Sequence, residues 1–256
     1  MNSCSNHNTL SIGHRGAKGY IAENTYESIS KAIELGVDGI EIDVFKCASG
    51  ELVLFHDKNL KELTGESGLI ENLTIKELEQ FLVLGKYKIP TLKDVLTRIE
   101  TPLFVNIELK GLNTAQSTSK IIKDLSKNTS WSLEHFIVSS FNWNELEQFR
   151  SIDKNTPVGV LVSKSMSINE AIEFGKKINA QAIHPNFKLL NDKTVKKIKN
   201  NGFKIYTWTV NDKDDINFMK KLKVLHLIKP MQLFIFLKIT FLILLKNRLR
   251  IIMILV

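Results

Sequence analysis

The chain has 256 residues, of which 43% are hydrophobic, 24% charged and 8% aromatic. This composition is typical of a globular protein and excludes a disordered chain, a collagen-like repeat and a disulfide-stapled miniprotein. The formal net charge of +8 comes from one end of the chain. The segment after Ile216 contains eight basic residues and no acidic ones, whereas the part before it carries 27 basic and 27 acidic residues. Since the body has no basic patch, we expect no nucleic-acid partner.

The cysteines and the first residues indicate the cellular compartment. Cys4 and Cys47 have no Cys or His nearby at the spacing of a thiolate metal site. The first eight residues are polar and lack the basic start and apolar core of a signal peptide. We therefore expect a cytoplasmic protein with reduced thiols.

Short apolar runs alternate with longer amphipathic runs over residues 8–222, a pattern typical of a parallel sheet covered by helices. Strands are predicted at residues 10–13, 39–45, 52–55, 103–109, 136–139, 157–161, 181–184 and 204–208. Helices are predicted at residues 24–35, 91–99, 115–127, 143–150, 168–178, 192–200 and 212–222, with Asn24 capping the first. Residues 58–90 interrupt this repeat. Seven strand–helix units are counted, and a (β/α)₈ barrel needs an eighth strand after residue 222.

Acidic side chains lie within two of the predicted strands at a spacing of two. Glu41 and Asp43 therefore share one face of their strand, and Asn106, Glu108 and Lys110 share one face of the next. Inside a barrel that face is the lumen, so three carboxylates are expected to meet near a lysine. Their oxygen atoms are the ligands that Mg²⁺ and Ca²⁺ prefer.

Two histidines follow strands at the same end of the predicted barrel. Imidazole titrates near neutral pH, so His14 and His56 are candidates for a general acid and a general base. Arg15 and Lys110 are charged donors suited to a phosphate. Trp208 ends the seventh strand and either lines the substrate site or covers the lumen; we place it among the substrate-binding residues. Together these groups indicate cleavage of a phosphodiester.

The order and spacing of these motifs resemble the glycerophosphodiester phosphodiesterase family over residues 11–222. The motifs that carry the resemblance are His14-Arg15-Gly16, Glu23-Asn24-Thr25, Glu41-x-Asp43, His56-Asp57, Glu108-x-Lys110, Val138-Ser139-Ser140-Phe141, His184-Pro185-Asn186 and Tyr206-Thr207-Trp208-Thr209-Val210-Asn211.

The resemblance implies a (β/α)₈ barrel with a small insertion after the second strand, where residues 58–90 lie. It implies one divalent cation, Ca²⁺ or Mg²⁺, held by Glu41, Asp43 and Glu108. It also implies His14 and His56 as general base and acid in either order, with the phosphate held by Arg15 and Lys110. The expected reaction converts a glycerophosphodiester and water into glycerol 3-phosphate and an alcohol. The attacking group is either water or the neighbouring glycerol hydroxyl.

The end of the chain departs from the family pattern, in which a final strand reads Asp-Gly-Ile-Ile-Thr-Asp. We therefore divide the chain into a barrel over residues 1–223 and an atypical basic, apolar tail over 224–256. The tail is a membrane-contacting segment, or residues 224–228 form the eighth strand, or a reading-frame shift near residue 223 replaced the native end. We favour the frame shift, and a missing strand would leave an open sheet edge. The alternative functions are a related phosphodiesterase acting on lysophospholipids at a membrane and an inactive remnant with a broken barrel.

Overall fold

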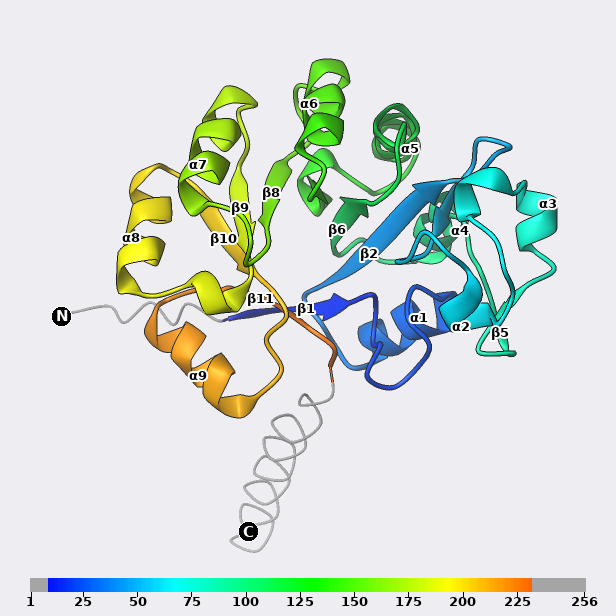
Figure 1. Cartoon of the computed structure of the whole chain (residues 1–256), viewed down its shortest axis with the longest axis horizontal. Coiled ribbons are helices and arrows are strands. Elements are labelled where there is room, and N and C mark those ends of the chain that lie inside the picture. Colours follow the sequence, from blue (N-terminus) through cyan, green and yellow to red (C-terminus); the bar gives the residue numbers. More distant parts are fainter. Residues whose placement is uncertain (1–8, 232–256) are drawn as a thin grey trace, which may run out of the picture.

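The computed structural model describes residues 9–231, in which eight parallel strands form a closed cylinder surrounded by helices (Figure 1). Each strand pairs with the next in chain order around the cylinder. The barrel strands are β1 (Leu10–His14), β2 (Gly39–Lys46), β6 (Phe104–Leu109), β7 (Phe136–Ser140), β8 (Val158–Val162), β9 (Ala182–Pro185), β10 (Lys204–Thr207) and β11 (His226–Lys229). The predicted (β/α)₈ barrel is thus confirmed.

Helices cover the outside of the cylinder because one face of each strand is apolar. In β2, Ile40, Ile42 and Val44 are completely buried against the helix layer, while the residues between them point into the lumen. The helices that link the strands are α1 (Tyr26–Glu34), α4 (Leu92–Arg98), α5 (Ala115–Asn128), α6 (Trp143–Ile152), α7 (Ile168–Lys177), α8 (Asp192–Asn200) and α9 (Lys213–Lys221). Short 3₁₀ turns cover Leu133–His135 and Phe187–Leu189.

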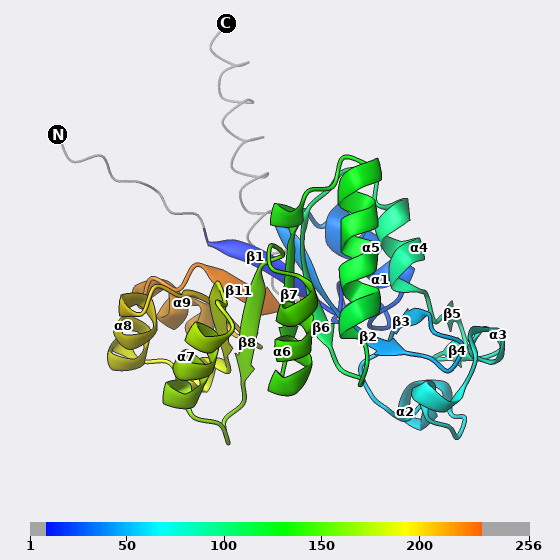
Figure 2. The ribbon, with the colours of Figure 1, turned by 90° about the horizontal axis from the view of Figure 1, so that it is seen from above.

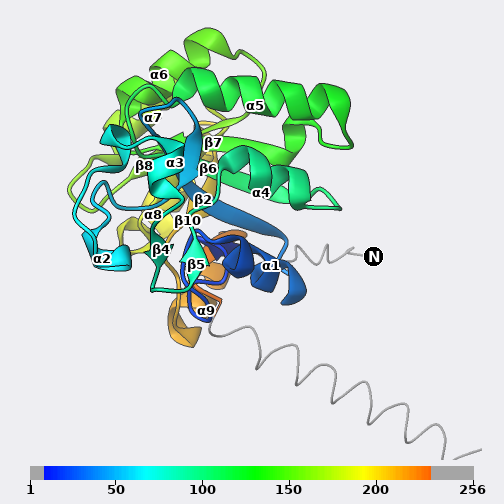
Figure 3. The same ribbon diagram turned by 90° about the vertical axis from the view of Figure 1, so that its right-hand side faces the viewer.

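The insertion between β2 and α4 packs as a separate lobe. Its first strand, β3 (Leu52–Leu54), runs antiparallel to β2. It continues with α2 (Lys61–Thr64), the 3₁₀ turn Ile70–Asn72, α3 (Ile75–Leu78), β4 (Leu82–Val83) and β5 (Tyr87–Lys88). These elements gather at one end of the molecule (Figure 2), and α2 and α3 lie on the side of the barrel away from the start of β1 (Figure 3). The lobe has its own small apolar core, which includes Phe55, Leu60 and Ile70.

The eighth strand closes the barrel, so the open edge expected from the atypical sequence is not present. β11 pairs with β1 through Ser11↔Leu227 and with β10 through Tyr206↔His226. Leu227 is buried against the helix layer and Ile228 faces the lumen. This strand can replace the family pattern because its pairing with β1 and β10 uses main-chain groups, and Leu227 and Ile228 fill its two faces.

The structure therefore removes the main structural reason for an inactive remnant with a broken barrel, and it places the last strand beyond residue 223. The frame shift concerns the coding DNA and stays a prediction. Residues 232–256, which include most of the predicted membrane-contacting tail, lie outside the described residues. Between residues 9 and 231, none of the helices has the length and apolar character needed to cross a bilayer.

Candidate active site

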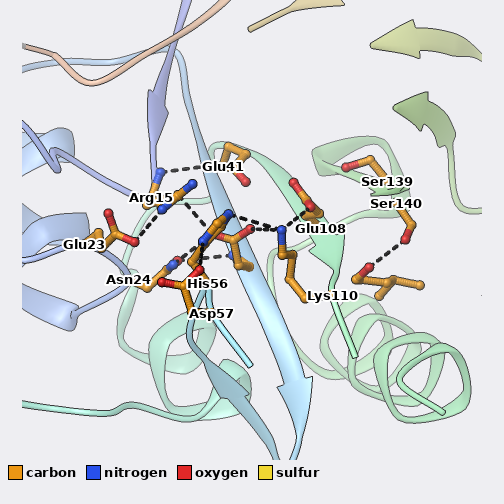
Figure 4. A network of polar contacts seen from close by, with 12 residues as sticks. Arg15, Glu23, Asn24, Glu41, His56, Asp57, Glu108, Lys110, Ser139 and Ser140 are labelled. Carbon is orange, nitrogen blue, oxygen red and sulfur yellow. Dashed lines mark hydrogen bonds and ion pairs between the residues drawn. The ribbon is translucent and has the colours of Figure 1, made fainter. Parts of the chain in front are cut away.

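Three buried carboxylates meet in the lumen where β2 and β6 lie side by side. The register pairs Asp43 with Glu108, and Glu41 lies two residues before Asp43 on the same face. One oxygen from each of the three lies within 4.8 Å of the other two, and the residues are only 2%, 1% and 8% exposed for Glu41, Asp43 and Glu108. The structure thus brings together the three residues predicted to hold a cation. Figure 4 labels two of them, Glu41 and Glu108, on neighbouring strands.

The electrostatics of this cluster are those of a site that needs positive charge. Burial, together with the neighbouring carboxylates Asp43 and Glu108, raises the pKa of Glu41 well above its ordinary value. Burial and the charge of Asp43 raise the pKa of Glu108 to about 7. Oε1 of Glu41 and Oδ1 of Asp43 are buried and accept no hydrogen bond from the described residues. Buried carboxylate oxygens without donors are costly unless a cation or proton compensates them.

Two cationic side chains flank the carboxylates. The Arg15 guanidinium lies 3.3 Å from Asp43 Oδ2 through Nε, and it also pairs with Glu23. The Lys110 Nζ atom lies 2.9 Å from Glu108 Oε1 and 4.0 Å from Asp43 Oδ1. Burial alone would lower the pKa of Lys110, but Glu108 and Asp43 outweigh it and raise the pKa, so the ammonium stays charged.

The two histidines line the same cavity and contact different charged groups. His14, at the end of β1, has Nε2 3.8 Å from Glu41 Oε2. His56 follows β3, and its ring contacts Asp57 Oδ1 through Nδ1 at 2.7 Å and Lys110 Nζ through Nε2 at 3.2 Å. Burial, and next the charge of Arg15, hold the pKa of His14 well below its ordinary value. Burial also lowers the pKa of His56, although Asp43 opposes the shift. In the site without cation or substrate, both shifts favour the neutral ring.

An apolar wall faces the charged groups across a cavity of about 100 Å³. The wall is formed by Phe141, Leu161, Trp208 and Ile228. The Trp208 indole donates to the main-chain carbonyl of His184 at 2.8 Å, and the Phe141 ring packs edge-on against it with centroids 5.3 Å apart. Trp208 thus lines the cavity, and its part in substrate binding stays a prediction. Phe141 belongs to a motif that carries the family resemblance but was given no role of its own. Leu161 and Ile228 were not singled out from the sequence, because an apolar residue in a strand is equally expected in a core.

One site residue was misinterpreted from the sequence. Asn24 was expected to cap the first helix, but Thr25 does so by accepting from the Ser28 main-chain N–H. The Asn24 side chain instead donates through Nδ2 to Asp43 Oδ2 at 2.9 Å and accepts from the Asp43 main-chain N–H at 3.1 Å. Its φ of 57° lies in the left-handed region, which asparagine tolerates better than most residues. Asn24 therefore fixes the orientation of Asp43.

Glu23 and His184 complete the surroundings of the site. Glu23 pairs with Arg15 and lies 3.7 Å from Lys18. It contacts the site residue Arg15 but does not line the cavity. The His184 ring is completely buried in the lumen beside Gly159 and Tyr206. The centroids of the His184 and Tyr206 rings lie 4.9 Å apart. Burial lowers its pKa to about 3.

Comparison with known proteins agrees with this fold and site. Residues 14–228 match the model of the glycerophosphoryl diester phosphodiesterase family. A glycerophosphodiester phosphodiesterase from Caldanaerobacter subterraneus subsp. tengcongensis is 31% identical over 223 residues, covering 83% of this chain and 90% of the relative.

Two solved structures are also similar. A phosphodiesterase from Oleispira antarctica, in complex with the product sn-glycerol-3-phosphate, has a TM-score of 0.78 and 25% identity. The match covers 86% of the present chain and 92% of the Oleispira antarctica chain. A glycerophosphodiester phosphodiesterase from Thermotoga maritima has a TM-score of 0.75 and 28% identity, and the match covers 91% of the present chain and 99% of the Thermotoga maritima chain. The present chain is therefore a barrel enzyme of the phosphoric diester hydrolase class. It belongs to the glycerophosphoryl diester phosphodiesterase family.

Proposed function

We propose that this protein hydrolyses glycerophosphodiesters to glycerol 3-phosphate and an alcohol, with a divalent cation and two histidines at the site. The proposal depends above all on one observation: two carboxylates, the Arg15 guanidinium and two imidazoles line a single small cavity, and Asp43 and Lys110 contact these groups from behind. The glycerol 3-phosphate bound to the similar Oleispira antarctica enzyme supports a substrate of this class.

The residues present fit a divalent cation. The unpartnered oxygens of Glu41 and Asp43 and the raised pKa of Glu108 all call for a positive charge in the space between them. Ca²⁺ or Mg²⁺ held by these three residues supplies a Lewis acid that neutralises charge on the phosphate.

Arg15 and Lys110 are positioned to hold the diester itself. Both side chains donate hydrogen bonds only, and both are anchored by carboxylates that keep their charged ends beside the cavity. In a partly buried site, such fixed donors stabilise the negative charge that develops on the phosphoryl oxygens without having to reorganise.

His14 and His56 exchange protons with the reacting oxygens. One neutral imidazole accepts the proton of the attacking water or glycerol hydroxyl. The other ring takes up a proton from solution when the negatively charged phosphate binds beside it, and donates that proton to the leaving alkoxide. Asp57 orients the His56 ring through Nδ1 and stabilises its charged form. The apolar wall around Trp208 lies opposite these groups, where it can pack against the carbon skeleton of the substrate.

The decisive experiment measures release of glycerol 3-phosphate from glycerophosphocholine by the full chain with Ca²⁺ or Mg²⁺. We expect activity that EDTA abolishes and added cation restores. His14→Ala and His56→Ala should each lose about 10²–10⁴-fold, whereas His135→Ala, at an exposed 3₁₀ turn outside the site, should leave the rate unchanged. Full activity in EDTA would refute the cation, and a wild-type protein that releases no glycerol 3-phosphate with either ion would refute the reaction.

A further inference from the structure

The loop that carries Lys110 borders an open cavity on one side. Residues 110–114 connect β6 to α5, and a cavity of about 430 Å³ lies against the loop between Lys46, Leu112 and Gln148. The Leu112 side chain is 59% exposed, so it contributes little burial to hold the loop in place. Lys110 itself continues the pairing of β6 with β2, since its main-chain N–H donates to the Val44 carbonyl at 3.0 Å. Beyond Lys110, the course of the loop depends on polar contacts to its main chain.

Two carboxylates make those contacts from opposite sides. Glu145 of α6 accepts hydrogen bonds from the main-chain N–H groups of Asn113 at 3.2 Å and Ala115 at 2.8 Å. Glu71, in the 3₁₀ turn of the insertion, accepts from the Leu112 main-chain N–H at 3.2 Å through Oε1. Glu145 secures the start of α5, while Glu71 holds the part of the loop nearer to Lys110.

Glu71 is also connected to the segment that carries His56. Its Oε2 atom lies 2.9 Å from the Nζ atom of Lys58, two residues after His56. The residue before it, Ile70, donates its main-chain N–H to the Lys58 carbonyl at 3.1 Å and is completely buried. The 3₁₀ turn thus lies between the two segments whose side chains meet at the His56–Lys110 contact.

Gly111 shows how closely the loop approaches this turn. A Cβ atom at Gly111 would lie 2.8 Å from Phe45 Cδ1 and 3.1 Å from Glu71 Oε1. Only a residue without a side chain allows the loop to come near enough for the Leu112 N–H to reach Glu71.

We propose that Glu71 is a positioning residue, by which the insertion holds the Lys110 loop against the His56 segment and so places the Lys110 ammonium for the substrate phosphate. The inference rests on the proposed function and assigns to the insertion a part in that reaction. Glu71 touches no reacting atom: it acts through the Leu112 main chain, which its Oε1 atom binds, while its Oε2 atom makes only a partly exposed ion pair with Lys58.

Three single variants separate this role from a general effect on stability. Glu71→Met keeps the side-chain length but removes the acceptor, and we expect kcat/KM to fall about tenfold, as small displacements of a positioned group do. Glu71→Gln keeps an oxygen for the Leu112 N–H and should recover to within about threefold of wild type. Lys58→Met removes only the partly exposed ion pair and should stay within about twofold. Thermal unfolding by circular dichroism accompanies each variant.

A double-mutant cycle with Lys110→Ala tests whether Glu71 acts through Lys110. In the Lys110→Ala background, Glu71→Met should change kcat/KM less than about twofold. The same tenfold loss in both backgrounds, or a Glu71→Gln variant as impaired as Glu71→Met, would overturn the proposal.

The dissociation constant of glycerol 3-phosphate, measured by calorimetry in the presence of cation, gives a readout that does not require turnover. It should rise in Glu71→Met and not in Lys58→Met, and equal values in the two variants would also overturn the proposal. A wild type that binds glycerol 3-phosphate but does not turn over contradicts the proposed reaction alone.

Discussion

Replacing Asn24 should weaken cation binding without touching a predicted ligand. The side chain makes two hydrogen bonds with Asp43, and both residues are buried. In Asn24→Gly, the Asp43 main-chain N–H loses its acceptor and the Asp43 carboxylate loses a donor. A buried group left unpaired costs about 1–3 kcal/mol, so we expect the free energy of unfolding to fall by about that amount.

The effect on the cation follows from the same contacts. Outer partners of metal ligands typically contribute about 10–100-fold to affinity, and we expect that loss of Ca²⁺ or Mg²⁺ affinity in Asn24→Gly. Asn24→Ala should lose a similar amount of affinity but about 1 kcal/mol more stability, because alanine is strained at the φ of 57° that glycine adopts freely.

Calorimetric titration with the cation and urea unfolding measure the two quantities separately. Asn191→Gly is the matched control, since Asn191 caps α8 by accepting from the Thr194 main-chain N–H at 3.0 Å, away from the site. It should lose some stability and no cation affinity. A dissociation constant that is the same in Asn24→Gly and wild type would refute the reasoning that Asn24 orients Asp43 for binding.

Three further results are expected. Because the pKa of Glu108 is raised to about 7, protons compete with the cation, and the affinity of the protein for the cation should fall as the pH drops from 8 to 6. The raised pKa also means that the free energy of unfolding of the cation-free protein falls as the pH rises through 7. A cation affinity that does not change with pH would contradict both expectations. Gly159→Ala would place Cβ 2.2 Å from His184 Nε2, so urea unfolding should show a loss of about 1–3 kcal/mol that His184→Ala partly relieves; additive losses in the double variant would contradict this reasoning. Trp208→Ala should raise KM more than it lowers kcat in steady-state kinetics, because the indole belongs to the apolar part of the cavity lining; a change in kcat alone would argue against it.

The barrel and the convergence of its acidic residues could be predicted because both follow from periodicity. A spacing of two along a strand fixes a shared face, so Glu41 and Asp43 had to point the same way, and the register of β2 with β6 then brings in Glu108. The roles of these residues stay predictions until the cation is measured.

Other features depend on choices that local sequence leaves open. Asn24 and Thr25 are both good helix caps, and only the packing of α1 beside β2 decides that Thr25 caps while Asn24 reaches Asp43. Strand β11 lacks the family motif, so its existence is decided by the two neighbouring strands whose main-chain groups it pairs. Glu71 reads as an ordinary surface acid, because the N–H that it binds lies 41 positions further along the chain.

The pairing of β11 with β1 also has a consequence for the order of events during synthesis. His14, the acidic cluster and Lys110 are all translated within the first 110 positions, yet Ile228 completes the cavity wall and His226–Lys229 joins the two ends of the sheet. A nascent chain still lacking that last strand has every reactive group but no finished chamber around them. The enzyme is therefore assembled only when nearly all of its barrel has left the ribosome.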